Sequence, residues 1–124
     1  MPPIPRASLR VAAAQAEPNP GDIAGNAAVA ARLAARAAGE GARLVVLPEL
    51  FLPGYHLPAL GAEPSGTHLA ADETTHVSDV RLDRLRAVAR DQQVVVVAGA
   101  AVRYPDGRRT SAASGASTAR GPAP

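Results

Sequence analysis

Glu49 is the residue of this chain that is best placed to do chemistry. It follows a short apolar run, 44–47, that is typical of a buried strand, and Pro48 ends that run. α/β proteins place catalytic groups at the carboxyl ends of parallel strands, because the loops there converge on a cleft. A carboxylate in such a cleft can accept and return a proton. The alternative is a structural role, in which Glu49 caps the strand end or pairs with an arginine.

A second group of residues has the chemistry of a metal site. Four side chains that can ligate zinc or iron follow one another closely: His68, Asp72, Glu73 and His76. Their spacing would place three of them on one face of a helix. However, the Pro-Ser-Gly sequence at 64–66 and two adjacent threonines favour a loop. We therefore expect exposed polar side chains here and no metal site.

Two residue types that much enzyme chemistry needs are missing. There is no cysteine, and all 13 basic residues are arginines, so there is no lysine. The lack of cysteine excludes disulfides, thiolate metal sites and a thiol nucleophile within these 124 residues. A reaction that requires a cysteine or a lysine therefore cannot be completed by this chain alone.

The charges and apolar runs indicate no nucleic-acid or membrane partner. The 13 arginines and 11 acidic residues are interspersed, which leaves a net charge of only +2, and aromatic residues make up 2% of the chain. Arg81, Arg84, Arg86 and Arg90 cluster, but aspartates lie among them, so a solvated helix face is expected. The longest apolar run, 94–102, is too short to span a bilayer, and the N-terminus lacks the apolar core of a secretion signal. We expect a cytoplasmic protein.

The pattern of elements predicts an α/β fold. Apolar runs and helical spacing predict strands at 9–14, 44–47, 94–98 and 100–104, and helices at 23–38 and from 78 or 79 to 91. Asp22 is expected to cap the first helix. Strand, helix and strand with short joins predict two parallel strands with a right-handed crossover. A long loop is expected at 53–77, and Gly99 is expected to interrupt the last apolar run.

The end of the chain differs in composition from the rest. Residues 111–124 include no large apolar side chain, and this composition predicts a disordered tail. The turn at 105–107 normally leads into a return strand, which such a tail is not expected to supply. The predicted division is a leader at 1–8, one α/β region at 9–110 and the tail at 111–124.

Several separate patches occur together in a fixed order. They are Val-Ala-Ala-Ala-Gln at 11–15, Gly21-Asp22 followed by Asn26, Leu-Val-Val-Leu-Pro-Glu-Leu-Phe at 44–51 with Gly54-Tyr55, and the strand pair at 94–107. In this order they resemble the N-terminal part of carbon–nitrogen hydrolases, the nitrilase superfamily. The likeness extends over residues 9–110.

The resemblance implies the first half of an α-β-β-α sandwich, with about four strands and with two helices on one face. The family hydrolyses non-peptide C–N bonds in amides, nitriles and carbamoyl compounds with a Glu, a Lys and a Cys, and it implies no metal or other cofactor. Carried over, Glu49 is the general base, and Tyr55 either lines the substrate cleft or packs under a loop. The Lys would stabilise the oxyanion, and the Cys would be the acylated nucleophile.

In the family, the Lys and the Cys lie beyond the point where this chain ends. We therefore expect a truncated or frameshifted hydrolase that is inactive as an isolated chain, with a small amide or nitrile as substrate if the enzyme is completed. A non-catalytic binding or assembly module and one half of a split enzyme are the alternatives. A half sandwich leaves one sheet face uncovered, through which copies of the chain could self-associate.

Overall fold

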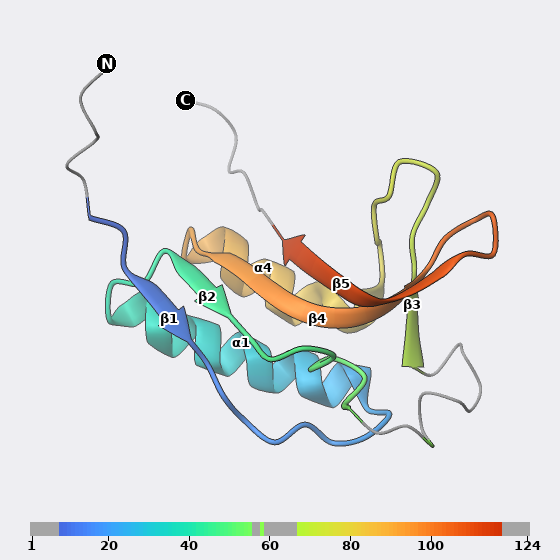
Figure 1. Ribbon diagram of the computed structural model, residues 1–124. Coiled ribbons are helices and arrows are strands. Elements are labelled where there is room, and N and C mark those ends of the chain that lie inside the picture. The colour runs from blue at the N-terminus through green and yellow to red at the C-terminus, as the bar shows by residue number, and fades with distance from the viewer. Residues whose placement is uncertain (1–7, 56–57, 59–66, 118–124) are drawn as a thin grey trace, which may run out of the picture.

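In the part of the chain that the structure describes, a five-stranded sheet has two helices, α1 (Ile23–Gly39) and α4 (Asp83–Asp91), on one side (Figure 1). The computed structural model describes residues 8–55, 58 and 67–117, and for 111–117 it describes the backbone alone. The strands are β1 (Val11–Ala13), β2 (Leu44–Val46), β3 (His68–Ala70), β4 (Val95–Arg103) and β5 (Arg109–Ser117). The sheet order is β1-β2-β4-β3 with all pairs parallel, and β5 pairs antiparallel with β4. The predicted α/β class is confirmed.

β4 pairs directly with β2, β3 and β5, and β1 pairs with β2. β2 pairs with residues 95–97 of β4, and β3 pairs with residues 101–103. β5 pairs with β4 along both of these parts. Because β5 occupies one side of β4, β2 and β3 must lie end to end along the other side.

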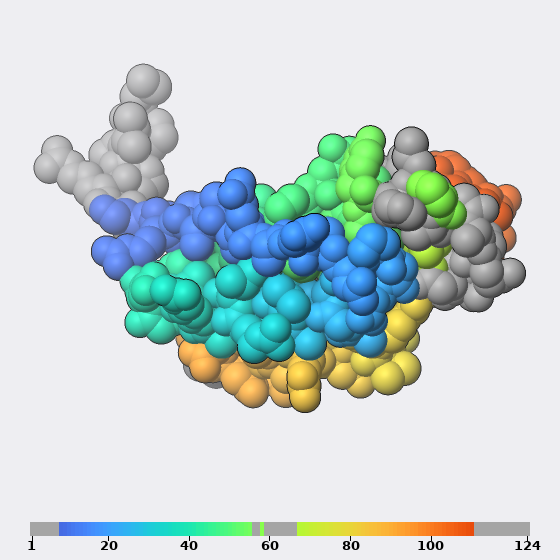
Figure 2. Space-filling model, turned by 90° about the horizontal axis from the view of Figure 1, so that it is seen from below, coloured from blue at the N-terminus to red at the C-terminus, as the bar shows by residue number. Residues whose placement is uncertain are grey.

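The helices follow the predicted order. α1 (Ile23–Gly39) connects β1 to β2, and α4 (Asp83–Asp91), preceded by the short 3-10 helix η1 (Val80–Leu82), leads into β4. The carboxylate of Asp22 accepts a hydrogen bond from Gly25 N at 2.9 Å and caps α1 as predicted. Figure 2, which views the molecule from below, shows α1 and α4 side by side. Neither helix, nor any other part of the described ranges, has a helical span long and apolar enough to cross a membrane.

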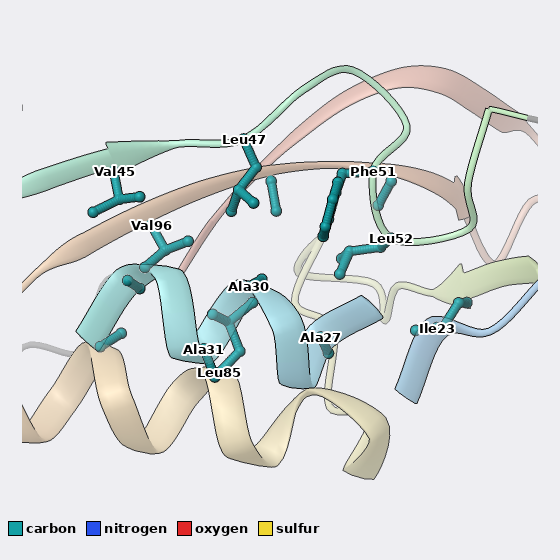
Figure 3. Packing of buried hydrophobic residues seen from close by; sticks show 14 of the residues in the cluster. Ile23, Ala27, Ala30, Ala31, Val45, Leu47, Phe51, Leu52, Leu85 and Val96 are labelled. Atoms are coloured by element: carbon teal, nitrogen blue, oxygen red, sulfur yellow. The ribbon is translucent and has the colours of Figure 1, made fainter. Parts of the chain in front are cut away.

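The core lies between these helices and the sheet. Val45 and Val96 are neighbours in the sheet, and both point toward α1 (Figure 3). α1 presents alanines to the strands, among them Ala30 and Ala34, which are completely buried. Small side chains let a helix pack close to a sheet, although each buries little apolar area. The largest fully buried side chain is that of Phe51, which follows Glu49 by two positions.

The other face of the sheet is covered by none of the described helices. Side chains alternate between the two faces of a strand. The residues next to those in the core therefore form two rows on the opposite face, Val11-Leu44-Val95 and Ala13-Val46-Val97. Val11 is 51% exposed and Val46 is 38% exposed. We refer to these six residues as the open face.

The structure differs from the predicted strands at three points. β3 lies inside the region expected to be a loop, 53–77, and β4 runs through Gly99 without a break. Residues 109–117 form the return strand β5, where disorder was expected from residue 111 on. Residues 118–124 lie outside the described part of the chain.

The return strand forms in spite of its small side chains because its pairing uses the backbone. A strand is held to its neighbour by N–H and C=O groups that every residue except proline supplies in full. In the register of the hairpin, Ser114 is opposite Gly99 and Gly115 is opposite Ala98. Composition alone therefore gives a poor prediction for a strand that extends an existing sheet.

Candidate active site

Glu49 lies in a tight turn that begins where β2 ends. Phe51 N–H donates to the Pro48 carbonyl at 3.2 Å, which closes the turn around Glu49 and Leu50. Leu50 is buried, and its φ of 51° lies in the left-handed region that leucine seldom adopts. Such a conformation persists only when the surrounding structure fixes it. The turn that carries Glu49 is therefore held in place by its neighbours.

The turn fills the gap between β2 and β3 along β4. Leu47 N–H donates to the Val97 carbonyl at 2.9 Å, and Leu52 N–H donates to the Gly99 carbonyl at 3.0 Å. Hydrogen bonding along this side of β4 thus continues from β2 into the turn. From Ala101 onward, β4 pairs with β3. Glu49 is placed at the carboxyl end of β2, beside the middle of β4.

Gly99 makes this placement possible. A Cβ atom added at Gly99 would lie 2.2 Å from Leu50 N and 2.9 Å from Glu49 Cα, so no side chain fits there. The sequence predicts only an interruption of the strand at this position. A glycine inside a strand pattern can also mark the close approach of another backbone. This is the role of Gly99, which lets the backbone of Glu49 and Leu50 approach β4.

Asn26 joins the turn to α1. Its side-chain nitrogen donates to the carbonyls of Leu52 at 2.8 Å and Asn19 at 2.9 Å, and its side-chain oxygen accepts from Asn19 N–H at 2.8 Å. The side chain is buried, with 2% of the residue exposed. A second link runs from Gly21 N–H to the Pro53 carbonyl at 2.8 Å. Asn26 belongs to one of the sequence patches that resemble the family, but the sequence predicts no structural or catalytic role for it.

Glu49 is exposed, and its carboxylate has no partner among the described residues. Within residues 8–55, 58 and 67–117 it makes no hydrogen bond and no ion pair, so the alternative role of pairing with an arginine is not found there. An exposed carboxylate at the end of a strand can accept a proton from a neighbouring group and return it. Tyr55 is 65% exposed, and its predicted place in a substrate cleft stays a prediction.

The residues considered for a metal site are spread over a strand and a turn. His68 lies in β3, and its Nδ1 is 3.0 Å from the hydroxyl oxygen of Thr67. The Asp72 carboxylate accepts from Thr74 N at 2.8 Å, from the Thr74 hydroxyl at 2.7 Å and from His76 N at 2.9 Å. The hydrogen bond from the Thr74 hydroxyl is the main reason why the pKa of Asp72 is lowered. In the described ranges, no three His, Asp or Glu residues gather so that they could hold a metal ion.

The arginines at 81–90 do not form a uniformly solvated helix face. Arg81 forms an ion pair with Asp79 at 2.8 Å and also donates to the His68 carbonyl at 3.2 Å. Arg86 donates to the carbonyls of Val77 and Asp79. Both arginines are half-buried, whereas Arg84 and Arg90 are exposed as predicted. Two of the four arginines therefore fix the segment between β3 and α4.

Comparison with known proteins gives a consistent result. The family model described as carbon-nitrogen hydrolase matches residues 10–114. A nitrilase from Penicillium rubens is 32% identical over 100 residues, which cover 77% of this chain and 30% of the nitrilase. The crystal structure of an amidase from Nesterenkonia sp. matches with a TM-score of 0.57 and 28% identity, over 84% of this chain and 35% of the amidase.

A second solved structure is also similar to this chain. It is a double mutant of the amidase from Nesterenkonia sp. AN1 in complex with acrylamide, in which one glutamate is changed to glutamine and one cysteine to alanine. It matches with the same TM-score of 0.57 and the same identity of 28%, over 84% of this chain and 36% of the amidase. The chain thus spans about a third of the length of the relatives that it matches.

Proposed function

Because the chain belongs to the carbon–nitrogen hydrolase family, we propose that Glu49 is the general base of an amide or nitrile hydrolase. The observation that carries the proposal is the place of Glu49, in a fixed turn at the carboxyl end of a parallel strand, with a carboxylate that has no hydrogen-bond or ion-pair partner among the described residues. In the amidase from Nesterenkonia sp. AN1, the complex with acrylamide is that of a protein with a glutamate and a cysteine replaced. The replacement of a glutamate together with a cysteine in that complex supports the role given to Glu49.

The proposed chemistry is acyl transfer through a cysteine. For an amide, the Glu49 carboxylate takes the thiol proton, the thiolate attacks the carbonyl carbon, and the C–N bond breaks as the amine leaves with the proton from Glu49. Water then hydrolyses the thioester, with Glu49 again as the base, and gives the carboxylic acid and the free thiol. A lysine ammonium would stabilise the oxyanion that forms in each step.

The 124 residues supply one of the three groups that this reaction needs. They hold no cysteine and no lysine, so the nucleophile and the oxyanion donor must come from other polypeptide. We therefore expect the purified chain to be inactive toward small amides and nitriles. Turnover by the purified chain that disappears in Glu49→Gln would contradict this expectation.

A chimera tests the role of Glu49 directly. Residues 10–114 replace the matching segment of the Nesterenkonia amidase, and amide hydrolysis is measured at several substrate concentrations. We expect the chimera to be active and Glu49→Gln to lower kcat by roughly 10²- to 10⁴-fold, the usual contribution of a general base.

Glu40→Gln is the matched control, because Glu40 is an exposed glutamate at the far end of α1. Its kcat should equal that of the unmodified chimera. A folded and active chimera that keeps its kcat in Glu49→Gln would show that Glu49 is not the base.

A further inference from the structure

Asn26 is a buried polar residue whose hydrogen bonds reach two separate segments. Its side-chain nitrogen has two N–H groups, and both are used, one on the loop before α1 and one on Leu52. A buried amide is costly to leave without partners, so its position on α1 fixes the position of the two carbonyls that it binds. One of these carbonyls belongs to the segment that carries Glu49.

Leu52 is the residue through which that segment is hydrogen-bonded to both β4 and α1. Its N–H donates to the Gly99 carbonyl of β4 at 3.0 Å, and its C=O accepts from Asn26 of α1 at 2.8 Å. It also lies within the second of two successive turns that share Phe51: the first is closed from Phe51 N–H to Pro48 C=O, and the second from Gly54 N–H to Phe51 C=O. A shift of Leu52 therefore moves both turns, and Glu49 lies within the first.

We infer that Asn26 is a positioning residue, which holds the Glu49 carboxylate at its place in the active site through the carbonyl of Leu52. This inference rests on the proposed role of Glu49. It assigns a task to a residue that touches no reacting atom. Without the donor groups of Asn26, Leu52 keeps its hydrogen bond to β4 but loses its hydrogen bond to α1.

Hydrogen exchange on the full chain, read amide by amide by NMR, tests the structural part. Asn26→Asp keeps the size of the side chain and the acceptor for Asn19 N–H, but it removes both donors. We expect at least tenfold faster exchange at the N–H groups of Phe51, Leu52 and Gly54, with no such change in α4. Unchanged exchange at Leu52 would overturn the inference. Asn26→Ser, which keeps a single donor, provides a second variant if Asn26→Asp does not fold.

Two controls separate this effect from general loss of stability. Asn19→Ala removes an exposed side chain, whose contact is with Asp22 at 3.3 Å, and leaves the Asn19 backbone groups that bind Asn26. It should not change exchange at Leu52. Leu85→Ala creates a cavity in the core at α4, and it should speed exchange throughout the chain rather than in the turn.

Kinetics in the amidase chimera test the catalytic part. We expect Asn26→Asp to lower kcat at least tenfold with KM within about twofold, while Leu85→Ala, measured below its melting temperature, keeps kcat. An equal loss of kcat in Leu85→Ala, or an unchanged kcat in Asn26→Asp, would overturn the inference. The activity of the Glu49→Gln chimera is measured separately and tests the proposed function. If its activity persists, the proposed function fails, whereas normal kcat in Asn26→Asp beside an inactive Glu49→Gln means that only the inference about Asn26 fails.

Discussion

At Gly99 the backbone of a strand and the backbone of a turn meet with no side chain between them. The contact involves Leu50 N and Glu49 Cα, which are backbone atoms and cannot rotate away. Leu50 also has a left-handed φ, so the turn already has a conformation that its neighbours must stabilise. The position of Glu49 therefore depends on the absence of one Cβ atom.

We predict that Gly99→Ala destabilises the chain and displaces the Glu49 turn. An added Cβ at 2.2 Å from a backbone nitrogen forces either the turn or β4 to move, and overpacking of this kind costs about 1–3 kcal/mol. Urea unfolding measures the loss of stability, and the amide NMR shifts of residues 49–52 report the displacement.

Gly39→Ala is the matched control for this change. A Cβ at Gly39 meets no atom within 4 Å, and the residue lies at the end of α1, where alanine favours the helix. We expect Gly39→Ala to leave stability unchanged or to raise it slightly. If Gly99→Ala behaves in the same way, the close approach at Gly99 has no energetic consequence.

Among the elements, the connection between β3 and α4 is stabilised in part by the ion pair between Asp79 and Arg81. The Asp79 carboxylate accepts from Arg81 Nε at 3.0 Å and from Arg81 N at 2.9 Å, and it caps η1. Arg81 in turn holds the carbonyl of His68 in β3. The hydrogen bond from Arg81 is the main reason why the pKa of Asp79 is lowered.

We predict that Asp79→Asn lowers stability at pH 7 by about 1 kcal/mol, the usual size of such a partly exposed charge-assisted contact. Because folding lowers the pKa of Asp79, its contribution is fully present above the unfolded pKa near 4 and is lost as the pH falls through the folded pKa. The difference between the two chains should therefore disappear in strong acid. Urea unfolding across pH 2–7 measures it.

Asp83→Asn serves as the control, since Asp83 is exposed and its nearest arginine nitrogen, on Arg86, is 3.8 Å away. It should change stability by less than Asp79→Asn at pH 7. A difference between wild type and Asp79→Asn that is as large at pH 2 as at pH 7 would mean that the charge of Asp79 is not the cause.

The elements that could be predicted from the sequence are those with a strong internal pattern. α1 was predicted at 23–38 and found at Ile23–Gly39, because its alanines and its cap determine it locally. β2 and the valine run of β4 were likewise found, since both are dense in β-branched residues. β3 and β5 were missed because each is a strand only by virtue of pairing with β4.

The same distinction applies to the candidate site. Glu49 could be selected as a candidate from the strand that precedes it, because a strand end is a local feature. The contacts that position it could not be, since Gly99 and Asn26 lie far from Glu49 along the chain and meet its turn only in the folded molecule. The sequence shows where the carboxylate is, and the packing shows what holds it.

For the molecule as a whole, the open face is the feature with the clearest consequence in solution. Its two rows contain aliphatic side chains and no charge, and two such faces can pack against each other as sheets do in a sandwich. Self-association through this face stays a prediction. We expect light scattering at increasing concentrations to give a mass above the 12.6 kDa of one chain, and Val46→Lys to return the mass toward that value.

Val80→Lys is the appropriate comparison, because Val80 is the most exposed of the large apolar residues described and lies in η1, away from the open face. It should not change the measured mass. A mass of one chain at every concentration, or an equal effect of Val80→Lys and Val46→Lys, would show that the open face does not mediate association.

The end-to-end arrangement of β2 and β3 has a consequence for how such a chain can evolve. Both strands, and the Glu49 turn between them, are attached to the same side of β4. The chain that leaves this turn at Gly54 and returns at Thr67 is thus anchored at both ends by one rigid strand. A change in the number of residues between these anchors would therefore leave the turn that carries Glu49 in its place on β4. If Glu49 has the proposed role, the length of this connection can change in evolution without loss of the position of the base.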